Sequence, residues 1–121
     1  MFSACTSEGR LNVLVGATSA ECPMDLGDGL TITNIDTEGN NVVYTCVVDE
    51  MKSEISVADW DNSFVRSMMK EYIINDFISN PDPDMKELIQ LVKEANYNFV
   101  FRYIGSHTNN KIEIVVYPYE L

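Results

Sequence analysis

The sequence predicts one α+β domain in two layers, with a single antiparallel sheet and two helices packed on one of its faces. Its 121 residues are the length of one domain, and a hydrophobic content of 45% is enough to form a core. Apolar and β-branched runs lie toward both ends of the chain, and two stretches with apolar residues at three- and four-residue steps lie between them. The expected element order is therefore β-ββ-αα-ββ.

The first strand is expected at Leu11–Thr18, which is rich in apolar and β-branched residues. Before it, residues 1–10 are expected to be a flexible N-terminal tether, because Thr6–Arg10 are mostly small and polar. Residues 11–121 are then expected to form the single α+β domain.

A β-hairpin is the best-supported β element. Leu30–Ile35 begins with apolar and polar residues in alternation, Asp36–Asn41 is rich in turn residues, and Val42–Asp49 is a second β-branched run. The preceding segment, Cys22–Gly29, contains Pro, Gly and Asp and is expected to be a loop.

Two amphipathic helices are expected next. The first is expected to start after a Ser53 or Ser56 cap and to end near Asn80, because Pro81 and Pro83 disfavour helical geometry. Its apolar stripe consists of Val57, Trp60, Phe64, Met68 and Tyr72, widened by Val65, Met69, Ile73 and Phe77. Such a stripe predicts core, and the alternative is that Trp60, Met68, Met69, Tyr72 and Phe77 form a partner-binding or ligand-binding face.

The second helix is expected to have Asp82 as N-cap and Pro83 at its first position. Its apolar stripe consists of Met85, Leu88, Ile89, Val92 and Ala95.

A second hairpin is expected to close the domain. Alternating residues at Phe99–Ile104 and Ile112–Tyr117 flank the turn Gly105–Asn110, and Pro118 ends the last strand or places it at a sheet edge. Tyr117 and Tyr119 lie beside this edge. They are therefore candidates for contact with a partner or with a second copy in a homodimer.

Charge argues against a nucleic-acid partner, and hydropathy argues against a membrane-spanning segment. A net charge of -11, from 19 acidic and 8 basic residues, argues against nucleic acid, whose phosphates require clustered Lys and Arg. No run approaches the ~20 apolar residues that span a bilayer. The acidic surface is expected to serve solubility, and the alternative is that it binds a basic protein partner or cations.

The three cysteines indicate in which cellular compartment the protein is located. Phe2-Ser3-Ala4-Cys5 resembles the end of a bacterial lipoprotein signal peptide, which makes Cys5 the lipidation candidate. Such a signal has ~7–15 apolar residues before the cleavage site, so this reading expects the native chain to begin upstream of Met1. The alternative is an incidental cysteine in a cytosolic N-terminus. Cys22 and Cys46 are the disulfide candidates, and the alternative is that they are free core thiols.

No catalytic or metal-binding pattern stands out. The only histidine, His107, falls in a turn, where it is expected to be solvated, and Asp25–Gly29 has too few carboxylates for a calcium loop. The acid pairs Asp49–Glu50 and Asp59–Asp61 are poor candidates for a general acid and base. We therefore expect no enzymatic activity, no cofactor and no metal.

From Glu21-Cys22-Pro23 to Tyr119-Glu120-Leu121, the chain is similar to small lipoproteins of gut Bacteroidales. The resemblance implies export and no known activity. The expected function is an extracytoplasmic accessory or binding domain for an unknown protein or small ligand. Its expected location is the cell envelope, at the periplasm or outer-membrane surface, if Cys5 is lipidated, and the cytoplasm otherwise. Two alternatives remain: a cytosolic acidic interaction protein, such as an immunity-type inhibitor of a basic partner, and a small hydrolase with a cleft joining His107 to carboxylates.

Overall fold

The computed structural model describes residues 6–54, 56–79 and 81–121, and these form an α+β domain with one sheet. The helices are α1 (Ser7–Ser19), α2 (Glu50–Ser53), α3 (Ser63–Ile73) and α4 (Pro83–Ala95). The strands are β1 (Met24–Gly27), β2 (Leu30–Glu38), β3 (Asn41–Val48), β4 (Asn98–Gly105) and β5 (Lys111–Val116). Short 3₁₀ segments lie at η2 (Val57–Trp60) and η4 (Pro118–Glu120), and a π-helical turn, η3 (Ile74–Ile78), follows α3.

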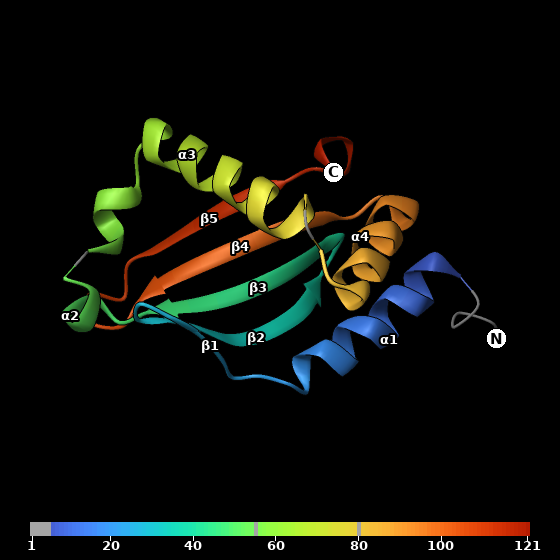
Figure 1. Cartoon of the computed structure of the whole chain (residues 1–121), viewed down its shortest axis with the longest axis horizontal. Helices are drawn as coiled ribbons and strands as arrows, with labels where there is room; N and C mark the ends of the chain where they lie inside the picture. The colour runs from blue at the N-terminus through green and yellow to red at the C-terminus, as the bar shows by residue number, and fades with distance from the viewer. Residues whose placement is uncertain (1–5, 55, 80) are drawn as a thin grey trace.

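The predicted α+β class and single sheet are confirmed, but the sheet is mixed and not wholly antiparallel. Among the described residues it has five strands in the order β1-β2-β3-β4-β5. Both predicted hairpins are antiparallel, whereas β3 and β4 pair in parallel. The reason is that the chain crosses over the sheet through α2, α3 and α4, so β4 starts beside the start of β3 (Figure 1).

The prediction of a first strand at Leu11–Thr18 is wrong, because this segment belongs to α1. Thr6 caps the helix by accepting a hydrogen bond from the Gly9 N–H at 2.9 Å. Leu11 and Val15, four residues apart, are buried in the core, while Val13 between them is 65% exposed. That spacing fits a helix and not a strand, so packing outweighs the β-branched composition. Ser7–Arg10 of the expected tether is also helical.

The first predicted helix is divided in the structure. The 3₁₀ turn η2 precedes α3, whose N-cap is Asn62, with its side chain accepting from the Val65 N–H at 2.9 Å. Ser56 precedes η2 but makes no side-chain cap bond. The second predicted helix is confirmed as α4, with Asp82 accepting from the Met85 N–H at 2.8 Å.

The helices α1, α3 and α4 pack on the same face of the sheet, one more helix than predicted. They share one buried cluster with the strands, to which α1 contributes Leu11, α3 contributes Ile73 and α4 contributes Leu88. At one end of the domain α1 and α4 lie side by side (Figure 1). Among the described residues, no helix is both long enough and apolar enough to cross a membrane.

Candidate functional site: an apolar groove beside β1

The helix layer leaves part of its sheet face open between β1 and α3. Two adjoining recesses of about 280 and 320 Å³ lie there, the first against α3 and the second against the start of α4. Both are lined by Leu26, Ile32 and Tyr44. Because they share these residues, we treat them as one feature, the β1–α3 groove.

The floor of the groove is apolar and aromatic. Alternate side chains of β2, β3 and β4 form it: Ile32, Tyr44, Cys46, Phe101 and Tyr103. The rings of Tyr44 and Phe101 stack with centroids 5.2 Å apart. Burial raises the pKa of Tyr44 above its ordinary value and that of Tyr103 to about 12. Both phenols are therefore neutral at physiological pH, and the floor carries no charge there.

The walls present apolar side chains to solvent. Leu26 of β1 is 54% exposed, and Tyr72 of α3, which lines the same recess, is 69% exposed. Phe64 and Met68 are also exposed. Phe64, Met68 and Tyr72 follow one another at four-residue steps and form a continuous row, which we call the α3 stripe.

The prediction that the helical stripe is core is therefore wrong for these positions. The apolar residues of α3 that are buried or half-buried are Val65, Met69 and Ile73, each one position after a stripe residue. Trp60 is half-buried and packs edge-on against Tyr103, with centroids 5.7 Å apart. The side chain of Phe77 lies outside the described part of the chain. Because the sequence pattern was apolar on a broad arc, it did not distinguish the core side from the exposed side.

The rim of the groove is acidic. The carboxylates lining its two recesses are Glu21, Asp28, Asp76, Asp82 and Asp84. No Lys, Arg or His is among the lining residues described for either recess. An apolar floor inside a ring of one charge sign favours a ligand with an apolar surface and positive charge beside it.

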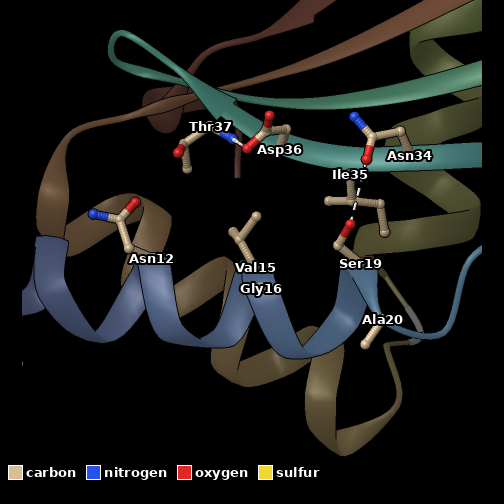
Figure 2. A pocket seen from close by; sticks show the side chains of 9 residues that line it. All are labelled: Asn12, Val15, Gly16, Ser19, Ala20, Asn34, Ile35, Asp36 and Thr37. Carbon is tan, nitrogen blue, oxygen red and sulfur yellow. Dashed lines mark hydrogen bonds between the residues drawn. The ribbon is translucent and has the colours of Figure 1, made fainter.

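A second, wider recess of about 580 Å³ lies between α1 and β2 (Figure 2). Its centre is closed by Val15 and Ile35, which are both buried. Its polar groups bond to one another: Ser19 Oγ donates to Asn34 Oδ1 at 3.3 Å, and the Thr37 N–H donates to Asp36 Oδ1 at 2.8 Å. Its other described lining residues are small or polar, with Asp36 as the one charged side chain among them, so the β1–α3 groove is the stronger candidate.

The carboxylate of Glu50, for which the sequence predicted no structural role, is nearly buried. The Glu50 side chain accepts hydrogen bonds from the backbone N–H groups of Val57 and Thr108 at 2.8 Å and of His107 at 3.1 Å. These hydrogen bonds lower the pKa of Glu50 to about 2, and the bond from the Thr108 N–H has the largest effect. A Cβ at Gly105 would overlap this carboxylate. Glu50 thus connects η2 to the β4–β5 turn by hydrogen bonds. The side chain of His107 is exposed, and only its backbone N–H bonds to Glu50.

The remaining candidate residues are the cysteines and the acidic loop at Asp25–Gly29, and those that the structure describes do not form a common site. Cys5 lies outside the described residues. Cys22, half-buried before β1, and Cys46, buried in β3, are free thiols, and burial raises the pKa of both. Asp25 accepts from the Gly27 N–H at 2.8 Å, which is ordinary turn chemistry. Among the described residues, no group of His, Cys, Asp or Glu is placed to hold a metal ion.

The predicted partner edge lies at the other side of the sheet. The rings of Tyr117 and Tyr119 are parallel, with centroids 5.6 Å apart, and Tyr119 is 84% exposed. Lys70 of α3 lies over the Tyr117 ring and pairs with Glu120 at 2.7 Å. Arg66 Nη1 donates to the Glu113 carbonyl of β5 at 3.2 Å, so α3 already occupies part of this edge. Homodimerisation there stays a prediction.

No protein-family model and no curated protein matches the sequence. Solved structures do match the fold over nearly the whole chain. A Pseudomonas aeruginosa protein proposed to be secreted is 12% identical, with a TM-score of 0.63 over 99% of this chain and 96% of that one. The pilotin EpsS of the Vibrio vulnificus type 2 secretion system is 13% identical, with a TM-score of 0.60 over 94% of each chain. The type II secretion pilotin AspS of Vibrio cholerae is 13% identical, with a TM-score of 0.54 over 95% of each. At these identities the likeness establishes a shared fold.

Proposed function

We propose that this chain is an extracytoplasmic accessory domain, without catalytic activity, that holds a segment of a partner protein in the β1–α3 groove. The observation that carries the proposal is the groove itself. It combines an uncharged aromatic floor with two walls, at Leu26 and Tyr72, that leave apolar surface in water. Contiguous apolar surface of this kind is typical of a binding site for a partner.

The extent of the surface favours a protein segment over a small ligand. From Phe64 to Tyr72 the α3 stripe runs for about 12 Å at the helical rise, and it continues into the recess against Tyr72. A small ligand fills a concave site, whereas this row lies exposed along a helix beside the recess. A partner segment could cover both at once.

The compartment is supported by the solved structures. A protein proposed to be secreted and two pilotins of type II secretion systems share this fold over at least 94% of the present chain. Together with the resemblance of Phe2-Ser3-Ala4-Cys5 to a lipoprotein signal end, they support a role at the cell envelope.

Site-specific photo-crosslinking in the native host tests the proposal. A photoreactive phenylalanine would replace Leu26 or Tyr72 in the groove, and Val13 or Tyr119 as matched controls, since all four side chains are more than half exposed. We expect the two groove positions to give an adduct with one segment of one envelope protein. We expect the two control positions to give no adduct with that segment.

Two results would contradict this proposal. Adducts at Tyr119 but not at Tyr72 would move the interface to the C-terminal tyrosines. Equal adducts at all four positions would show only non-specific contact. Because all four residues are exposed, the replacements are not expected to change the fold, and circular dichroism would verify that.

A further inference from the structure

Resting on the proposed function, we infer that the occupant of the β1–α3 groove is a basic amphipathic helix, with its apolar face on the floor and its cationic side chains against the acidic rim. The rim carboxylates lie on both sides of the floor. Asp28 belongs to the β1–β2 turn and Asp76 to η3 after α3, and both line the same recess. A segment lying between them therefore meets negative charge on either flank.

The recess of the β1–α3 groove that lies against the start of α4 is also lined by carboxylates. Glu21 lies between α1 and β1, and Asp84 lies in the first turn of α4. Among the lining residues that the structure describes, no Lys, Arg or His accompanies these carboxylates. Charges of one sign around an uncharged floor set the sign of the ligand, because a like-charged segment would be repelled.

The form of the ligand follows from the backbone around the groove. At the floor, Leu30–Ile32 of β2 is paired with β1 on one side and β3 on the other. An extended segment therefore finds no open strand edge on the floor to pair with, and the outer edge of β1 lies on the side away from β2 and the floor. A helix satisfies its own backbone hydrogen bonds and needs only side-chain contact, and its apolar face at three- and four-residue steps matches the α3 stripe.

Two designed peptides of 18 residues test the charge and the form together. Both have leucine on one helical face, and the polar positions are lysine in one and glutamate in the other. Each is labelled with fluorescein, and binding to the full chain is followed by fluorescence anisotropy at low and high salt. We expect the lysine peptide to bind at least about tenfold more tightly than the glutamate peptide, with affinity falling as salt rises.

Two matched double variants distinguish the effect of the rim carboxylates from the effect of the net charge of the protein. Asp28→Asn with Asp76→Asn removes two rim carboxylates, and asparagine tolerates the positive φ of 53° at position 28. Glu71→Gln with Glu87→Gln removes two exposed carboxylates that line neither recess. We expect the rim pair to weaken the lysine peptide by about three- to tenfold and the control pair by less than about twofold.

The outcomes distinguish this inference from the function on which it rests. Equal weakening by both double variants would overturn it, since net charge alone would then explain the binding. A glutamate peptide that binds as tightly, and is lost in Tyr72→Ser, would overturn it while leaving the groove as a binding site. Lysine-peptide binding that is unchanged in Tyr72→Ser would contradict the groove itself. Binding of neither peptide would overturn the inference, and the crosslinking experiment would then decide the proposed function.

Discussion

Glu50 shows how a single residue can determine local structure in this protein. Its side chain is 7% exposed and accepts the backbone N–H groups of Val57, His107 and Thr108. Donors from two segments far apart in sequence thus converge on one carboxylate, which favours its charged form. In the sequence, Asp49 and Glu50 stand out only as an acid pair that is a poor candidate for catalysis. The sequence gives no sign of this role, because most donors are backbone N–H groups and two of them come from a turn 57 and 58 residues away.

We expect Glu50→Gln to lower the melting temperature by several degrees at pH 7, because the amide offers one acceptor oxygen where the carboxylate offers two. The difference between wild type and variant should depend on pH. The folded pKa is about 2, below the ordinary value of 4.5, so the stabilisation is complete above about 4.5. It is lost as the pH falls from there through the folded pKa.

Thermal melts of both proteins between pH 7 and pH 2, followed by circular dichroism, measure this gap in melting temperature between wild type and variant. We expect it to be constant at and above about pH 5 and to shrink toward pH 2. The comparison cancels the other titrating carboxylates, which both proteins share. A gap that stays constant down to pH 2 would show that the charge of Glu50 contributes nothing to stability.

At the scale of elements, local signals identified some segments and missed others. The cap and proline of α4 predicted its start because Asp82, Pro83 and the Met85 N–H are neighbours in sequence. The hairpin of β2 and β3 was predictable for the same reason, since its turn at Gly39 needs a positive φ and lies between two β-branched runs. By contrast, α1 was predicted as a strand, because β-branched residues are frequent in it and its helical state depends on burying Leu11 and Val15.

The α4 cap gives a prediction at this scale. We expect Asp82→Ala to lower the free energy of unfolding by about 1 kcal/mol, because the Met85 N–H loses its acceptor. Chemical denaturation with urea measures the loss. Asp82→Asn is the matched control, since asparagine is also a good N-cap, and it should restore most of the stability. An equal loss in both variants would mean that the charge at the helix start, and not the cap bond, stabilises α4.

At the scale of the whole molecule, the groove results from how the helices divide the sheet face. One end of that face is covered by α1 and α4, and α3 lies nearer β5, so the face beside β1 is left open (Figure 1). The individual residues of the groove were visible in the sequence as parts of expected strands, a loop and helices. Their convergence was not, because Leu26, Tyr72 and Phe101 meet only after the β3–β4 crossover has formed.

A lipid anchor at Cys5 would also act on the whole molecule, and it stays a prediction. When the native gene is expressed in its host, we expect the protein to sediment with membranes and to incorporate an alkyne-labelled fatty acid. Cys5→Ser should release it from the membrane fraction, since an acyl chain contributes ~0.8 kcal/mol per buried CH₂ to membrane binding. A cytosolic protein that begins at Met1 with an unmodified thiol would instead support the acidic inhibitor of a basic partner.

The sequence by itself determined the α+β class, the two hairpins, α4 and the strongly acidic character. Each of these depends on residues close together in the chain or on composition alone. The tertiary structure decided that Leu11–Thr18 is helical, that β3 and β4 are parallel, and that Phe64, Met68 and Tyr72 face solvent. The physical reason is that burial is a property of the packed chain: an apolar residue shows that it can be buried, and only its neighbours in space decide whether it is.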